Sequence, residues 1–186
     1  SQLDKIYLSN LINYNKVVNQ RNKLLKELSF KSSEEKLETL DIWDLQLVKY
    51  GTEVMKRRVG FVQELNEIIG GLHEKLSGGT EKLTIEYQPC VEETTFLDTV
   101  TKMRERDLRM KSTCFGPHKD DLIFFINGSE VKKYGSQGQQ RTAALSLKLA
   151  EIELVKKVVK DTPVLLLDDV PVSYTHLRAH ETCADL

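Results

Sequence analysis

The feature that most constrains the fold of this chain is a stripe of mostly apolar side chains that repeats every seven residues within residues 1–76. Its positions recur at alternating spacings of four and three residues, which places them on one face of an α-helix. In residues 1–28 these positions are Leu3, Tyr7, Asn10, Tyr14, Val17, Arg21, Leu24 and Leu28. Because the stripe is apolar except at Asn10 and Arg21, we expect a helix whose packed face has two polar interruptions.

A second stretch repeats this spacing after a polar break at residues 29–33. Its positions are Leu40, Trp43, Leu47, Tyr50, Val54, Arg57 and Phe61, followed after a one-residue shift by Leu65, Ile68 and Leu72. Ser32 with Glu35 three residues later forms a capping-box pattern, which predicts the start of a second helix. Two long helices joined by a short break predict an antiparallel hairpin. It is either a projecting arm or an ordinary pair within a bundle.

The pattern changes after residue 76 from helical to mixed. Residues 83–87 alternate as a strand does, and residues 122–126 form an apolar, β-prone run. Asn127 and Gly128 tolerate the positive φ angles of a tight hairpin turn, so we expect a return strand over residues 130–134.

A charged helix is predicted over residues 96–110. It carries Lys102, Arg104, Arg106 and Arg109 among acidic neighbours. These cations form either a solvated charged face or a phosphate-binding strip. The net charge of the whole chain is −1, so any contact with nucleic acid must come from a local basic face.

A polar loop of Ser136, Gln137, Gly138 and Gln139 precedes a long helix predicted over residues 139–159. The first amides of a helix lack partners within it, and the helix dipole makes that end positive, so such a loop suits a phosphate. Taken alone, the loop is better explained as a plain Ser/Gly helix cap.

A wholly apolar run at residues 164–167 predicts a strand buried on both faces. It ends at Asp168 and Asp169. A carboxylate at a rigid strand end suits Mg²⁺, and a neighbouring carboxylate can orient an attacking water. By itself, Asp168 is also explained as a turn cap.

The order of these two motifs resembles that of ABC-type ATPase heads. The run Gly-Ser-Gln-Gly-Gln-Gln-Arg-Thr at residues 135–142 is similar to the RecF family version of the ABC signature loop, as are residues 21–26, 40–44 and 116–122. That family usually has arginine where this chain has Lys119. The resemblance implies an α/β fold: a partial ABC-type ATPase head, of the P-loop NTPase class, with an inserted antiparallel helical arm.

The resemblance also implies a division of the chain and a role for each motif. Residues 1–76 would form the helical arm (lobe II-like) and residues 77–170 the C-terminal part of the head (lobe I-like). The signature loop, residues 136–139, would contact ATP held by a second subunit. Asp168 would support Mg²⁺, and Asp169 occupies the position of the catalytic acid.

The implied function is ATP-dependent DNA binding in replication, recombinational repair and the SOS response. The implied partners are DNA with single-strand gaps or single-strand/double-strand junctions, a second copy of the protein in an ATP-dependent homodimer, and recombination mediator proteins. The implied location is the cytoplasm, and no membrane is expected to be bound. One alternative is a non-enzymatic helical protein-interaction module. Another is a different SMC/Rad-like ABC ATPase of DNA repair.

The sequence contains no Gly-x-x-x-x-Gly-Lys-Ser/Thr phosphate loop. The RecF family carries that loop near its N-terminus. We therefore expect a C-terminal fragment that is inactive alone, from a parent protein that is a weak DNA-dependent ATPase. His118 and Lys119 either touch nucleotide or DNA, or form a local ion pair.

Residues 172–182 lack any helical or strand period. Together with Asp185 and Leu186 they resemble the translation of a transposon-end sequencing adaptor, which defines a tail at residues 171–186. We interpret this tail as non-native. His176 and His180 have the spacing of a metal-binding pair, but they fall within the tail, and we expect no metal there. The three cysteines are far apart and suggest neither a zinc site nor a disulfide framework.

Overall fold

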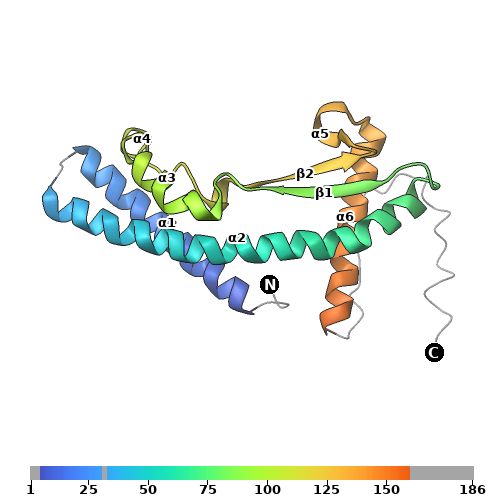
Figure 1. Ribbon diagram of the computed structural model, residues 1–186, viewed down its shortest axis with the longest axis horizontal. Coiled ribbons are helices and arrows are strands. Elements are labelled where there is room, and N and C mark those ends of the chain that lie inside the picture. The colour runs from blue at the N-terminus through green and yellow to red at the C-terminus, as the bar shows by residue number, and fades with distance from the viewer. Residues whose placement is uncertain (1–4, 31–32, 160–186) are drawn as a thin grey trace.

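One 43-residue helix, α2 (Glu34–Leu76), connects the two halves of the molecule (Figure 1). The computed structural model describes residues 5–30 and 33–159. At 1.5 Å per residue, α2 is about 65 Å long. The other elements are α1 (Lys5–Phe30), β1 (Leu83–Gln88), η1 (Glu93–Thr95), α3 (Phe96–Lys102), α4 (Arg104–Met110), η2 (Pro117–Lys119), β2 (Asp121–Ile126), β3 (Ser129–Glu130), α5 (Val131–Tyr134) and α6 (Gln137–Val159).

The predicted antiparallel hairpin is confirmed, because α1 lies against the first half of α2 (Figure 1). The stripe on α1 is buried from Tyr14 to Leu28. At the centre of this packing, a Cβ atom built on Gly51 would lie 2.6 Å from Cε1 of Phe96. Only glycine therefore allows α3 to pack this closely on α2.

Arg21, predicted as a polar interruption of the stripe, is fully buried. Its Nε atom donates to Oδ1 of Asp44 on α2 at 2.6 Å. Its Nη1 atom donates to Oδ2 of Asp107 on α4 at 2.6 Å and to Oγ1 of Thr113 at 2.9 Å. One guanidinium thus ties α1 to α2, to α4 and to the segment that follows α4.

Both carboxylates around Arg21 have further donors. Oδ2 of Asp44 accepts from Nη2 of Arg104 at 2.6 Å. Oδ1 of Asp107 accepts from the backbone amide of Cys114 at 3.0 Å. We call Arg21, Asp44, Asp107 and Arg104 the buried ion cluster. Its charges are two positive and two negative, and Arg104 also pairs with the exposed carboxylate of Asp41.

The second half of α2 packs in a different core, against the sheet and α6. The buried members are Val62, Leu65, Ile69, Leu83, Ile85, Ile126, Val131, Ala143, Ala150 and Leu154. The sheet is antiparallel in the order β1-β2-β3, with Leu83 opposite Ile126. Since α2 contributes to this core up to Ile69, it belongs structurally to both halves.

The tight hairpin at Asn127 and Gly128 is confirmed, with φ angles of 50° and 80°. The return strand predicted over residues 130–134 is wrong. Strand β3 covers only Ser129 and Glu130, and the chain then turns into α5. This turn buries Val131 in the core, and the Gly135 amide closes it with a 2.9 Å bond to the Val131 carbonyl.

Three predicted helix limits also need correction. The helix expected over residues 96–110 is divided at Met103 into α3 and α4. The N-cap of α2 is Ser33, whose hydroxyl accepts from the Lys36 amide, and not Ser32. The last helix begins at Gln137 and not at residue 139.

Several predictions lie outside the described residues: the buried strand at 164–167, Asp168, Asp169 and the tail at 171–186. The division of the chain at residues 76 and 77 stays a prediction. Within the described ranges, no helix has both the length and the apolar character needed to cross a bilayer.

Replacing Arg21 with methionine tests the buried ion cluster. The substitution leaves Asp107 buried without its cation, so we expect the free energy of unfolding to fall by about 3–5 kcal/mol. Chemical denaturation of the 186-residue chain measures this change. The control is Lys36→Met, because the Lys36–Glu27 pair is largely exposed and should leave stability almost unchanged. A loss below about 1 kcal/mol in Arg21→Met would contradict the prediction.

Candidate functional site

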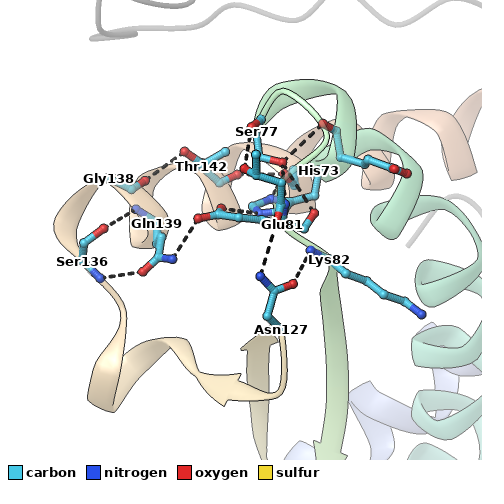
Figure 2. A network of polar contacts seen from close by, with 12 residues as sticks. His73, Ser77, Glu81, Lys82, Asn127, Ser136, Gly138, Gln139 and Thr142 are labelled. Carbon is cyan, nitrogen blue, oxygen red and sulfur yellow. Dashed lines mark hydrogen bonds and ion pairs between the residues drawn. The ribbon is translucent and has the colours of Figure 1, made fainter.

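The signature loop opens α6 with a reciprocal cap (Figure 2). The Gln139 amide donates to Oγ of Ser136 at 3.2 Å, and the Ser136 amide donates to Oε1 of Gln139 at 2.9 Å. The Gln140 amide reaches the Ser136 carbonyl at 3.0 Å. Ser136 is therefore the N-cap, and Gln139 holds the other half of a capping box.

The outer side of the signature loop is open, since Ser136, Gln137 and Gly138 are all exposed. A Cβ atom built on Gly138 would meet only Oγ of Ser136, at an ordinary 3.7 Å. Nothing in the described fold requires glycine here, although glycine in a helix costs about 1 kcal/mol relative to alanine. An uncovered hydroxyl, no side chain at Gly138 and the positive end of a 23-residue helix suit a phosphate that approaches from outside.

The inner side of the signature loop joins a chain of polar contacts that sequence reasoning missed (Figure 2). Nε2 of Gln139 donates to Oε1 of Glu81 at 2.8 Å. Oε2 of Glu81 lies 3.1 Å from Nε2 of His73, which is fully buried. Nδ1 of His73 lies 2.9 Å from Oγ of Ser146 on α6. The loop is thus connected to the last turn of α2.

One sequence signal did exist for His73. The stripe on α2 was expected to continue through Ile68 and Leu72, but the buried face runs through Leu65, Ile69 and His73. A histidine on the apolar face of a helix needs polar partners. The sequence does not say that they come from Glu81 and Ser146.

His118 forms local structural contacts through both ring nitrogens. Nδ1 accepts from the hydroxyl of Tyr14 at 2.6 Å, and Nε2 donates to the Thr113 carbonyl at 3.0 Å. Burial raises the pKa of Tyr14, so the phenol keeps its proton for this bond. Next to His118, Gly116 has φ +130°, and a Cβ atom there would lie 2.4 Å from the Tyr14 hydroxyl. The backbone here fits only glycine.

The ion pair expected near this segment forms through Asp120 and not through His118 or Lys119. Nη1 of Arg58 on α2 lies 3.0 Å from Oδ2 of Asp120. The same carboxylate accepts from the hydroxyl of Tyr87 and, at 2.8 Å, from the Cys90 amide. Asp120 therefore anchors the start of β2 on α2 and β1. Lys119 is exposed, and its role stays open.

The predicted phosphate-binding strip on residues 96–110 is partly engaged within the protein. Arg104 belongs to the buried ion cluster. The guanidinium of Arg106 lies over the ring of Phe115, 5.4 Å from its centroid. The structure therefore gives these two cations internal roles, and DNA-contact residues stay unassigned.

The chain is similar to curated proteins named DNA replication and repair protein RecF. It is 62% identical over 170 residues to that of Lachnospira eligens, covering 91% of this chain and 47% of the relative. It is 45% identical over 179 residues to that of Halalkalibacterium halodurans, covering 91% and 48%. The chain thus spans about half the length of these relatives. No protein-family model matches it.

Two solved structures have the same fold. One is described as the recombination mediator protein RecF-ATP in the RecFOR pathway, with a TM-score of 0.80 and 37% identity over 90% of this chain and 46% of that one. The second, described as RecF-ATPrS in the same pathway, also gives 0.80, with 38% identity. The fold is therefore that of part of an ABC-type ATPase head with its helical arm.

The contacts of His118 predict a pH dependence of stability. Partial desolvation lowers the pKa of His118, an exposed residue, from its ordinary value of 6.5. Below pH 6.5 the unfolded chain therefore takes up a proton that the folded chain does not. The contribution of His118 to the free energy of unfolding is therefore full above pH 6.5, and it is lost as the pH falls toward the lowered pKa.

We expect His118→Gln to lose less stability than the unsubstituted chain between pH 7.5 and pH 5.5. Urea denaturation at both pH values measures the difference. Since every other titrating group is shared, the comparison isolates His118. Equal losses in the two proteins would contradict the prediction.

Proposed function

We propose that this chain, which belongs to the RecF family over the residues that match it, forms part of an ATP-dependent DNA-binding protein of replication and recombinational repair. The sequence identity to RecF proteins of two bacteria supports the proposal. So does the fold shared with structures described as RecF-ATP and RecF-ATPrS. The activity and partners of the whole protein are part of the proposal.

The observation that carries the proposal is the open signature loop at the N-terminus of α6. ATP, when bound, supplies phosphate oxygens that such a helix end attracts. The Ser136 hydroxyl would donate to a phosphate oxygen, and the absence of a side chain at Gly138 would let the backbone approach it. The loop is exposed, which suits contact with nucleotide held by a second copy in an ATP-dependent homodimer.

The second part of the site would be formed by Asp168 and Asp169. We assign Asp168 to support Mg²⁺, because carboxylate oxygens are the ligands this ion prefers. We assign Asp169 to orient the attacking water and take its proton. The two composite sites of the homodimer would each combine these acids from one copy with Ser136 from the other.

The proposed setting is the bacterial cytoplasm, where chromosomal DNA lies. The DNA substrate would be single-stranded gaps and single-strand/double-strand junctions, and the protein partners would be recombination mediators. The two solved relatives are described as belonging to the RecFOR pathway, which supports mediators as partners.

A Ser136→Asp variant separates the cap from the phosphate contact. Aspartate is as good an N-cap as serine and favours the helix dipole, so stability should be unchanged. Its negative charge would face the phosphate, and like charges across an interface cost several kcal/mol. In a chimera that places the matched residues of this chain into the L. eligens protein, we expect ATP-dependent dimerisation to weaken by at least about 100-fold.

Sedimentation with and without ATP measures this dimerisation. The control is Ser136→Thr, which keeps both the hydroxyl and the cap and should dimerise within about threefold of the unsubstituted chimera. ATP binding by the isolated subunit should be equal in all three proteins. Undiminished dimerisation of Ser136→Asp would exclude a phosphate contact at Ser136.

An Asp169→Asn variant tests the proposed catalytic acid. The amide is nearly the same size as the carboxylate but cannot take a proton from water. In the same chimera we expect ATP hydrolysis to be abolished while ATP-dependent dimerisation remains. Single-turnover hydrolysis and sedimentation measure the two properties on one preparation. Turnover equal to that of the unsubstituted chimera would refute the role.

A further inference from the structure

We propose that Glu81 and His73 are positioning residues that hold the signature loop in its phosphate-contacting geometry and couple it to the long helix α2. This inference rests on the proposed function, because it assigns a role in the ATP site to residues outside the recognised motifs. It follows from the continuous chain of contacts between the loop and α2 (Figure 2).

The first step is the double role of the Gln139 side chain. Its oxygen accepts from the Ser136 amide at 2.9 Å, and its nitrogen donates to Glu81 at 2.8 Å. An amide rotated by 180° would place its oxygen against the carboxylate and its nitrogen against the amide N–H. Glu81 therefore selects the one rotamer of Gln139 that completes the cap of Ser136.

The second step is the double role of Glu81. Its other oxygen lies 3.1 Å from Nε2 of His73, which donates to it. Both carboxylate oxygens thus have a fixed partner, one on α6 and one on α2. Since a bond to a charged group is worth more than a neutral one, these two bonds to the Glu81 carboxylate are stronger than the neutral contacts along α6.

The third step is the rigidity of the segment that carries Glu81. The turn after α2 is closed by a 2.8 Å bond from the Gly79 amide to the Glu74 carbonyl. Asn127 then clamps the chain, because its side chain accepts from the Lys82 amide at 2.9 Å and donates to the Thr80 carbonyl at 3.3 Å. Glu81 is held from both sides, so a shift of α2 must reach Gln139.

The fourth step is the contact between His73 and α6 itself. Oγ of Ser146 lies 2.9 Å from Nδ1 of His73 and 2.8 Å from the Thr142 carbonyl, and its single proton serves one of these two contacts. The hydroxyl of Thr142 donates in turn to the Gly138 carbonyl at 2.9 Å. The polar chain therefore returns to the signature loop along α6, and the loop is held from two directions.

The consequence is a mechanical link between the arm and the nucleotide site. Helix α2 extends from the buried ion cluster, where it packs on α1, to His73 in its last turn. A displacement of the arm along or around α2 would be transmitted through Glu81 to Ser136. The reverse also holds, because coupling between two sites is reciprocal.

Exchanging the glutamate at position 81 with the glutamine at position 139 tests the inference. In Glu81→Gln, the new amide must use its oxygen for His73, so two NH₂ groups face each other. In Gln139→Glu, two carboxylates face each other. In the double variant Glu81→Gln/Gln139→Glu, the amide at position 81 donates to the carboxylate at position 139. A glutamate at that position still completes the capping box.

Two measurements are needed on the four proteins. Hydrogen exchange of the amides of residues 136–140 in the 186-residue chain, without ATP, reports the loop geometry directly. ATP-dependent dimerisation in the chimera reports its effect on the site. For each single variant we expect about tenfold faster exchange, and for the double variant a return of the exchange rate to within about threefold of the unsubstituted chain. Dimerisation should weaken about tenfold in Glu81→Gln, which adds no charge to the signature loop.

The controls separate positioning from general stability. Glu86→Gln removes the same charge from an exposed position on β1 and should change neither readout. ATP binding by the isolated subunit should be equal in all variants. If single variants exchange as slowly as the unsubstituted chain, or exchange in the double variant is not restored, the positioning role is overturned.

The two proposals can fail separately. If the unsubstituted chimera does not dimerise with ATP, the proposed function is wrong, while hydrogen exchange still decides whether Glu81 positions the loop. If the chimera dimerises and the single variants match it, the proposed function stands and the coupling through Glu81 is wrong.

Discussion

The guanidinium of Arg21 lies where α1, α2, α4 and the segment after α4 meet, with its side chain fully buried. A charge in that position is tolerated only while Asp44, Asp107 and Thr113 all stay in place. Apolar contacts between two helices permit small shifts of register, but two 2.6 Å bonds from one guanidinium to two carboxylates do not. The cluster therefore fixes the register of the arm and the position of α4 on it.

A buried polar side chain held by several polar partners is also found at the other end of α2. There His73 and Ser146 are both fully buried, and Glu81 and Ser146 are the partners that fix His73. Between the two polar points, α2 is a single helix with an apolar face. A long rigid helix pinned at both ends transmits displacement, whereas two independently packed pieces would not. This arrangement is why we connect the arm with the signature loop.

Local patterns in the sequence predicted the elements whose causes are local. The Asn127–Gly128 turn, the hairpin of long helices and the polar loop before α6 each depend on residues a few positions apart. The errors have long-range causes. Arg21 meets Asp107, which is 86 residues away in the chain, and Gln139 meets Glu81, 58 residues away. The strand predicted after Gly128 does not form beyond Glu130, because the turn into α5 buries Val131, and this burial outweighs the β-propensity of valine.

Three glycines separate what the fold requires from what a ligand would require. At Gly51 a Cβ atom would collide with Phe96, and at Gly116 it would collide with Tyr14 while the backbone adopts a positive φ. Packing explains both. At Gly138 a Cβ atom would make only an ordinary contact, and the neighbouring surface is open. Other glycines, such as Gly71, also lack an internal contact that requires them. Gly138 differs from these because it lies beside the capping serine at a helix N-terminus, where a phosphate can approach from outside. This contrast makes the signature loop, and not the segment around His118, the stronger candidate for the nucleotide contact.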